Sequence, residues 1–513
     1  MKRRQRRVQV DLEHLDDIVE STRDRTLDDQ ERSTLQSALH EMAAYISARN
    51  NTEKTRSVVP DTGEEPSPPQ EHKKPARGHG RNGADAFTGA KRVPVPHPGL
   101  EPGCPCPECL RGRVYHPKKG GQPSPIIRFS AGPPIGAIIY ELETLSCNLC
   151  RTVFRPEPPE EVGAEKYDET ASSMVAMAKY GHGIPFYRLE AIQRNCGVPL
   201  PASTAWELVK DAAEVLKPVH EELIREAAQA PVLHSDDTRV RLIEEERPPG
   251  EDRTGQFTTG FVAEFEDGRR AAVYVSGTRH AGENGADLLR KRANGLESPV
   301  LMCDALNHNR PKMDQGVQVL LANCLAHGRR KFVELFESFP EPCRHVLEEL
   351  GKVYAFDAEA RERGLDKHQR LKFHKAHSEP IMKGLRRWLT AQIEEKLVEP
   401  NSRLGKAIQY LLTHWMALTL FLRQAGAPLD NNICERALKK VVLHRKNALF
   451  YRTMNGAAAG DLFMSLIHTC ELNEVNAFVY LTELQRHPVE IRANPGQWMP
   501  WNYQSQLAPS RPP

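Results

Sequence analysis

A short apolar run that ends in two acids constrains the fold of this chain more than any other stretch. Residues 232–233 are aliphatic and lead to Asp236 and Asp237, and charged and apolar residues then alternate through residue 243. This pattern predicts a β-strand that crosses a core and delivers an acid to the edge of a sheet. A second apolar run, residues 300–303, ends at Asp304 in the same way. We therefore predict a mixed α/β core with carboxylates at its strand ends.

A third acid, Glu435, follows a polar turn and opens a basic segment that has the residue spacing of a helix. Asp236, Asp304 and Glu435 are far apart in the sequence, yet each lies at the boundary of a predicted element. If the three carboxylates converge, their hard oxygen ligands suit Mg²⁺ or Mn²⁺, and Mg²⁺ sites commonly serve phosphate chemistry. The alternative is that the acids are unrelated, because acids at strand ends are common without a shared site.

Several longer motifs occur in a fixed order along the chain. They are LHSDDT, LMCDALNHN, CLAHGRRKF and LDNNICERALKKVVLHRKNALF, with AKYGHGIPFYRLEAIQRNCGVPLPASTAW and paired cysteines upstream. Over roughly residues 100 to 485 the chain thereby resembles the insertion sequence 66 transposase family. The resemblance implies a ribonuclease-H-like catalytic domain whose Asp-Asp-Glu triad is Asp236, Asp304 and Glu435. Asp237 stands where Glu is expected, and Lys439-Lys440 stand where Arg-Pro is expected; neither departure touches the triad.

The same resemblance implies a reaction and its partners. DNA would be hydrolysed at the transposon ends, and the freed 3′-hydroxyl would attack target DNA, with two Mg²⁺ or Mn²⁺ ions held by the triad. The partners would be double-stranded DNA, further copies of this chain and accessory proteins encoded by the same element. Two rival interpretations are a ribonuclease-H-like nuclease or resolvase that uses the same acids, and a zinc-containing DNA-binding protein without active catalysis.

Charge and hydropathy indicate the cellular compartment of the protein but do not indicate its function. The 513 residues carry a formal net charge of +2, so nucleic-acid binding depends on local clusters of basic residues rather than on the whole chain. No run of apolar residues is long enough to span a membrane, and the basic start lacks the apolar region of a signal peptide. We therefore expect a cytoplasmic protein, in which disulfides are disfavoured.

Eleven cysteines then need another explanation. Two CxxC pairs, Cys106/Cys109 and Cys147/Cys150, have the spacing of a zinc ribbon, and a β-rich insert separates them. Four thiolates close the coordination shell, so this Zn²⁺ would be structural. Cys104 is an alternative to Cys106 as a ligand, and the alternative to a zinc site is a set of redox or incidental cysteines, which two such pairs in a reducing compartment disfavour.

The remaining segments divide the chain into modules. Residues 1–50 are predicted to be helical, as a coiled-coil oligomerisation segment or a helical hairpin, and residues 51–99 to be a disordered, basic, Pro-rich linker. The zinc-ribbon module covers residues 100–160. Residues 165–228 are predicted to be a helix-turn-helix-like DNA-binding module, or a plain helical hairpin, whose second helix Ser203 or Thr204 caps.

The catalytic core is predicted in two parts around an insertion. The first part, residues 229–334, contains three antiparallel strands, a helix over 284–293 and the Asp304 strand. An all-helical insertion follows over residues 335–424, and residues 425–455 bring the third acid. Residues 456–490 are a C-terminal helical element, in which Gly456 and Gly460 precede a helix over 461–472. Residues 491–513 are predicted to be a flexible tail.

Basic residues near the second and third acids are candidates for DNA contacts, with a merely solvated basic face as the alternative. Arg329, Arg330 and Lys331 are predicted to lie at the start of a helix. His327 and Asn432 are second-tier candidates for the site. The candidates are Arg329, Arg330, Lys331, Arg436, Lys439, Lys440, Arg445 and Lys446.

Overall fold

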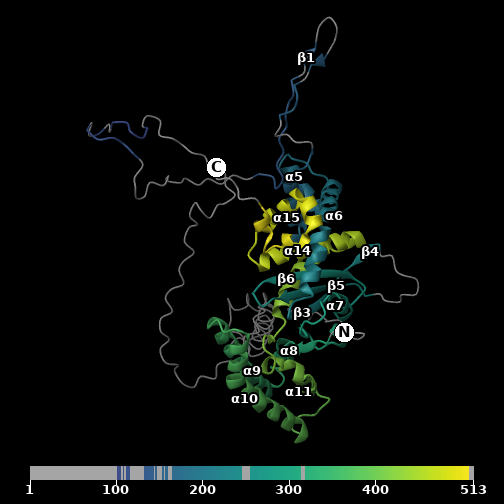
Figure 1. Cartoon of the computed structure of the whole chain (residues 1–513). Helices are drawn as coiled ribbons and strands as arrows, with labels where there is room; N and C mark the ends of the chain where they lie inside the picture. The colour runs from purple at the N-terminus through teal and green to yellow at the C-terminus, as the bar shows by residue number, and fades with distance from the viewer. Residues whose placement is uncertain are drawn as a thin grey trace, which may run out of the picture.

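The computed structural model in Figure 1 describes most of the chain from residue 165 onward. The described residues are 101–105, 108, 111–115, 132–143, 145–146, 153–154, 156–159, 165–244, 255–312 and 318–507.

Much of the predicted N-terminal architecture lies outside these residues. This applies to the helical segment 1–50, to the linker 51–99 and to the four cysteines Cys106, Cys109, Cys147 and Cys150. Within the predicted zinc-ribbon region, β1 (Leu145–Ser146) and β2 (Val153–Phe154) pair antiparallel. The zinc site itself stays a prediction.

A mixed five-stranded sheet forms the centre of the molecule, in the order β6–β5–β3–β7–β8. Strands β3, β5 and β6 are antiparallel neighbours, whereas β3, β7 and β8 pair in parallel. Helix α7 connects β6 to β7. The mixed α/β class is confirmed, and the sheet is compatible with the predicted ribonuclease-H-like core. The bounds are β3 Val232–Arg239, β5 Phe257–Glu264, β6 Arg270–Gly277, α7 Ala281–Leu289, β7 Val300–Cys303 and β8 Leu320–Asn323.

The sheet separates two hydrophobic cores, because successive side chains of a strand point to opposite faces. Leu233 and Leu301 enter the larger core, whereas Val232, Val300 and Met302 enter the smaller one. This alternation explains why the strands read as continuous apolar runs in the sequence: both of their faces are covered by helices.

Helix α6 is the main support of the larger core. It packs against α4, α14 and β6 and buries Val209, Leu216, Val219 and Leu223, which share one face at helical spacing. The helices of this segment are α4 Glu169–Ala176, the π-helical turn η3 Met177–Gly181, α5 Phe186–Asn195 and α6 Ala202–Ala227.

The predicted helix-turn-helix-like pair corresponds to α5 and α6. The predicted cap is wrong: α6 begins at Ala202 after Pro201, and neither Ser203 nor Thr204 caps it. The extended Pro201 sets the entry of the chain, so the helix starts before either hydroxyl residue. A role of this pair in reading DNA stays a prediction.

Helix α14, Met454–Leu472, covers the free edge of β6. Asp461, Ser465 and Thr469 accept hydrogen bonds from the backbone N–H groups of Ser276, Tyr274 and Ala272, at 2.7, 2.9 and 2.9 Å. The partners recur every four residues in α14 and every two residues in β6. Four helical residues span about 6 Å and two strand residues about 6.7 Å, so the two spacings match closely enough for three successive contacts. A sheet edge that would otherwise be open is thereby satisfied by side chains.

The predicted start of this helix at residue 461 is wrong, because Gly456 and Gly460 both lie inside α14. Gly460 serves close packing instead. A Cβ atom at this position would lie 2.5 Å from the Tyr451 hydroxyl oxygen.

The helical insertion builds the smaller core together with α8. Its helices gather at one end of the molecule in Figure 1, and Trp415 is buried among them while Trp388 packs at their margin. The bounds are α8 Leu325–Val333, α9 Pro340–Glu362, α10 Lys367–Glu394, α11 Arg403–Thr413, α12 Trp415–Leu418 and η5 Leu420–Leu422.

The C-terminal segment returns to the larger core. Through residue 507 it is packed, which corrects the predicted flexible tail: Trp498, Met499 and Tyr503 are buried, and the Tyr480 hydroxyl donates to the Trp498 carbonyl at 2.7 Å.

Strand β9 pairs in parallel with β4, Leu242–Glu244. The remaining bounds are α13 Asn432–Ala448, β9 Tyr451–Thr453, α15 Ala477–Arg486, α16 Pro488–Ala493, η6 Pro495–Trp498 and η7 Tyr503–Gln506.

Across the described part of the chain, membrane-spanning candidates were sought among the helices, and none combines the necessary length and apolar character.

Candidate active site

The three predicted acids lie on elements that meet at one end of the central sheet. Asp236 is in β3, and Asp304 directly follows β7, the parallel neighbour of β3. Glu435 lies in the first turn of α13, which packs against β3. Parallel pairing carries the ends of β3 and β7 to the same edge, and α13 adds the third acid there.

The pKa of the Asp236 carboxyl reflects the charges of the acids around it. Burial of its carboxyl, together with the charges of Asp304, Asp237 and Glu435, raises its pKa to about 7. The Asp237 backbone N–H donates to Asp236 Oδ1 at 2.8 Å and opposes this rise. A carboxyl whose ionised form is disfavoured by its neighbours is stabilised by a bound cation.

Asp304 is oriented by the loop that follows it. Its Oδ1 accepts a hydrogen bond from Asn309 Nδ2 at 2.5 Å and another from the Leu306 backbone N–H at 3.1 Å. Asn309 is itself buried, so the carboxylate is held against a fixed partner.

Glu435 faces two residues of α8. Its Oε1 lies 3.7 Å from His327 Nε2, and its Oε2 lies 3.7 Å from Arg330 Nη2. Oε1 is buried and has no hydrogen-bond partner among the described residues. The structure therefore brings the second-tier candidate His327 to the third acid.

Among the residues that the structure describes, two groups of side chains could hold a metal ion by the spacing of their ligand atoms, which lie within 4.8 Å of one another. One is Cys324, His327 and Glu435; the other is Asp237, His280 and His308. Burial raises the pKa of the Cys324 thiol to about 12, so Cys324 is a poor source of a thiolate ligand. The carboxylates of the triad are the donors that fit a hard divalent ion.

Asn431 is a site residue that sequence reasoning missed. Its side-chain amide donates to the Ser235 carbonyl at 2.9 Å, and its Oδ1 lies 3.1 Å from His234 Nδ1. His234 Nε2 in turn lies 3.2 Å from Glu264 Oε2. This buried chain links the start of α13 to β3 immediately before Asp236. In the sequence, the signal that could have pointed to Asn431 is its position beside Asn432, as the first of two adjacent amide residues.

Asn432 itself does not reach the acids. Its side-chain amide donates to Asp430 Oδ2 at 2.8 Å, a local turn contact before the helix. Its assignment as a second-tier site residue has no support in these contacts.

Asp237 points to the other face of β3, as the alternation of strand side chains predicts. Its Oδ2 lies 2.9 Å from His280 Nδ1 at the start of α7. The two neighbouring acids thus face different surroundings: Asp236 is near Asp304 and Glu435, whereas Asp237 contacts His280 at the start of α7.

The basic candidates on α13 divide into two groups. Arg436, Lys439 and Lys446 are exposed and lie on one side of the helix. Lys440 instead pairs with Glu471 at 2.5 Å, and Arg445 donates to Thr238 Oγ1 at 3.2 Å. The exposed group is available to DNA, whereas the other two residues hold α13 in place.

The basic candidates on α8 are placed differently from the prediction. They lie in the second half of α8, Leu325–Val333, not at its start. Arg329 is buried, with 6% of its surface exposed, which leaves no open guanidinium for a DNA phosphate. Arg330 faces Glu435, and the Lys331 ammonium lies 4.4 Å from the centre of the Tyr410 ring.

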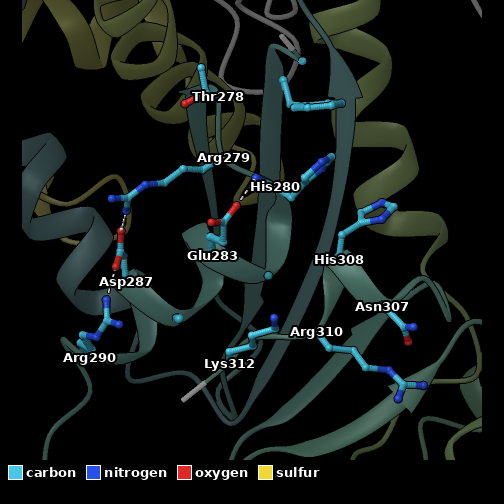
Figure 2. A pocket seen from close by; sticks show the side chains of 14 residues that line it. Thr278, Arg279, His280, Glu283, Asp287, Arg290, Asn307, His308, Arg310 and Lys312 are labelled. Carbon is cyan, nitrogen blue, oxygen red and sulfur yellow. Dashed lines mark hydrogen bonds and ion pairs between the residues drawn. The ribbon is translucent and has the colours of Figure 1, made fainter. Parts of the chain in front are cut away.

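A basic pocket of about 640 Å³ adjoins the site where Asp237 meets α7. Figure 2 shows its side chains. Its lining residues come mainly from the start of α7 and from the segment after Asp304, and they include Arg279, His280, Glu283, Asp287, Arg290, Asn307, His308, Arg310 and Lys312.

Comparison with known proteins adds a family and relatives. The profile of the family described as "Transposase IS66 family" matches residues 166–459, which is more than half of the chain and includes all three acids. Two proteins of Sinorhizobium fredii, named uncharacterized protein y4jD and uncharacterized protein y4hP, are 27% and 26% identical to this chain over the aligned residues. The first alignment covers 70% of this chain and 71% of y4jD; the second covers 71% and 68%.

Proposed function

Since this chain belongs to the IS66 family of transposases, we propose that it cuts DNA at the ends of an insertion sequence and joins those ends to target DNA. The observation that carries the proposal is the convergence of Asp236, Asp304 and Glu435. Burial of the Asp236 carboxyl, together with the nearby charges of Asp304, Asp237 and Glu435, raises its pKa to about 7. Such an arrangement is costly unless a cation or a proton offsets it.

The residues present fit a pair of divalent ions. Asp236, Asp304 and Glu435 supply carboxylate oxygens, and the buried Glu435 Oε1 lacks a hydrogen-bond partner among the described residues. When bound, Mg²⁺ or Mn²⁺ would activate the attacking oxygen and stabilise the leaving oxygen of the phosphodiester.

The chain's own groups would position the DNA. Arg330, beside Glu435, offers a charge to the phosphate that is cut. The exposed side chains of Arg436, Lys439 and Lys446 would hold the flanking backbone, since they extend along the helix that begins at the third acid. This arrangement needs no covalent protein–DNA intermediate.

The wider assembly is part of the same proposal. Residues 1–50 would bring two copies of the chain together, so that both transposon ends are held at once, and Cys106, Cys109, Cys147 and Cys150 would hold a structural zinc ion. Accessory proteins of the same element would complete the complex.

The test uses purified full-length protein, labelled duplexes that carry the ends of the element, and Mg²⁺ or Mn²⁺. We expect nicking at the ends and joined products with a second duplex. Cleavage without joining would favour a nuclease or resolvase. Binding without cleavage in either metal would favour a DNA-binding protein whose catalytic site is inactive.

A further inference from the structure

The basic pocket beside Asp237 has fixed walls. A Cβ atom at Gly282 would lie 2.4 Å from the Arg310 carbonyl oxygen and 2.6 Å from that of His308, so α7 and the segment after Asp304 are in direct contact. The Glu283 carboxylate accepts a hydrogen bond from the His280 backbone N–H at 3.1 Å and caps α7. Packing between α7 and the segment after Asp304 therefore sets the shape of the pocket.

Aromatic rings line one side of the pocket. The His280 ring contacts both Phe257 and His308, with ring centroids 4.1 and 4.5 Å away, and Asp237 holds its Nδ1. His308 is exposed, so it presents ring surface at the pocket mouth, where Figure 2 shows it beside His280. Planar rings of this kind offer a platform on which a nucleobase can stack.

The charge of the pocket is positive. Arg279 and Arg290 both pair with Asp287, which leaves their charges partly offset. Arg310 and Lys312 have no acidic partner among the residues that the structure describes, and Arg310 Nε is buried without a hydrogen bond there. Lys312, and Arg310 at the outer margin of the pocket (Figure 2), are cations without a described acidic partner, and they suit a phosphate next to a base.

The position of the pocket ties it to the acids. One wall contacts Asp237, the neighbour of Asp236, and the other wall follows Asp304 within eight residues, at Asn307 to Lys312. Both walls are thus close to the triad along the chain, although Asp237 itself faces the other side of β3 from Asp236. A volume of about 640 Å³ is in the range of pockets that enclose small ligands, and it cannot admit a duplex.

We propose that this pocket binds an unpaired nucleotide of the DNA strand that is cut or joined, with its base on His308 and a flanking phosphate near Arg310 and Lys312. The inference rests on the proposed function and adds a single-stranded subsite to it. A metal ion on Asp237, His280 and His308 is the competing occupant. It is disfavoured because Arg310 and Lys312 would repel it and because the Asp237 carboxylate already contacts His280.

The test compares two DNA probes on the full-length protein in EDTA, so that no cleavage occurs. One is a blunt duplex; the other is the same duplex with a short single-stranded extension at its 5′ or 3′ end, whose first unpaired base is a fluorescent adenine analogue. We expect one of the extended duplexes to bind roughly fivefold or more tightly than the blunt one, with quenched fluorescence, as stacking of one base predicts.

Variants of the exposed His308 distinguish the loss of base stacking from a general loss of folding. His308→Ala should lose the preference and the quenching but keep its affinity for the blunt duplex, and His308→Phe should retain both. Arg310→Ala combined with Lys312→Ala should weaken binding of the extended duplex and reduce its salt dependence. His368→Ala, an exposed histidine at the start of α10, is the matched control and should behave as the wild type.

Three results would overturn the inference: no preference in the wild type, a preference that survives in folded His308→Ala, or a preference that appears only when the EDTA is replaced by zinc. Binding and cleavage of blunt end duplexes report on the proposed function separately. A protein that cuts and joins ends but shows no preference for the extension refutes the subsite alone.

Discussion

The side-chain amide of Asn431 donates a hydrogen bond to the Ser235 carbonyl, 2.9 Å away, and so ties the start of α13 to the strand that carries Asp236. Asn431 is fully buried, and its Oδ1 faces His234 Nδ1. We therefore propose that Asn431 is a positioning residue, which fixes the distance between the first and third acids without offering a ligand of its own.

Replacing Asn431 by alanine should loosen the site as well as the fold. The change leaves the buried Ser235 carbonyl and His234 ring without their partner, at a cost of about 1–3 kcal/mol for each unsatisfied group. We expect a lower melting temperature and weaker Mn²⁺ binding, measured by calorimetry, with little change in DNA affinity. Asn432→Ala is the control, because Asn432 contacts only its own turn through Asp430. Unchanged Mn²⁺ affinity in Asn431→Ala would mean that the amide has only a structural role.

The acid triad is tested by amide substitutions that keep size and remove charge. Asp236→Asn, Asp304→Asn and Glu435→Gln should each reduce cleavage by several orders of magnitude while DNA binding survives, because each removes a metal-binding carboxylate. Gel assays of cleavage and of binding on the same duplex measure both effects.

Asp237→Asn is the matched control for the first ligand. Asp237 faces His280 on the other side of β3, so its loss should affect cleavage less. An inactive Asp237→Asn beside an active Asp236→Asn would move the first ligand by one position. Normal cleavage by Glu435→Gln would place the third acid elsewhere.

The raised pKa of Asp236 predicts how metal-free stability depends on pH. The pKa of Asp236 is about 7 in the folded chain, against an ordinary aspartate value of 3.8 in the unfolded chain. Between these values the folded state holds a proton that the unfolded state has released. The free energy of unfolding should therefore fall as pH rises, by up to about 1.4 kcal/mol per pH unit from this group.

Asp236→Asn removes this dependence, since an amide does not titrate. In EDTA the variant should gain stability relative to the wild type between about pH 5 and pH 8, as followed by thermal unfolding at each pH. Metal binding by the wild type should strengthen over the same range, because the ligand must be ionised. If the difference in melting temperature is the same at both ends of the range, the pKa of Asp236 is not raised.

The cover that α14 provides for the edge of β6 predicts a stability effect far from the acids. Thr469 Oγ1 accepts from the Ala272 N–H at 2.9 Å, and both residues are buried. Thr469→Val keeps the shape and leaves that N–H unsatisfied, which should cost about 1–3 kcal/mol in chemical denaturation. Thr482→Val is the control: the Thr482 hydroxyl bonds only within its own helix, to Phe478, so its loss should cost less. Equal costs for the two variants would contradict the edge contact.

The paired cysteines predict one zinc ion per chain. Elemental analysis of purified protein should give about one equivalent, held by Cys106, Cys109, Cys147 and Cys150. Loss of zinc in Cys104→Ser but not in Cys106→Ser would exchange those two residues as ligands. A zinc content well below one equivalent would remove the site.

The sequence by itself determined those features that leave a local pattern along the chain. Apolar runs ending at Asp236 and Asp304 indicate strands because burial repeats along the chain, and Glu435 opens a helix because its neighbours have helical spacing. Family motifs then assign the acids.

The tertiary structure alone decided the contacts that make these residues a site. Asn431 and His234 are 197 residues apart, and Thr469 and Ala272 are also 197 apart. Such pairs leave no periodic signal, since each partner reads locally as an ordinary polar or small residue. The same reason explains why the burial of Arg329 and of Trp498 was not predicted. Whether a side chain meets solvent, DNA or another helix depends on what the rest of the chain packs against it, and short-range periodicity does not encode that.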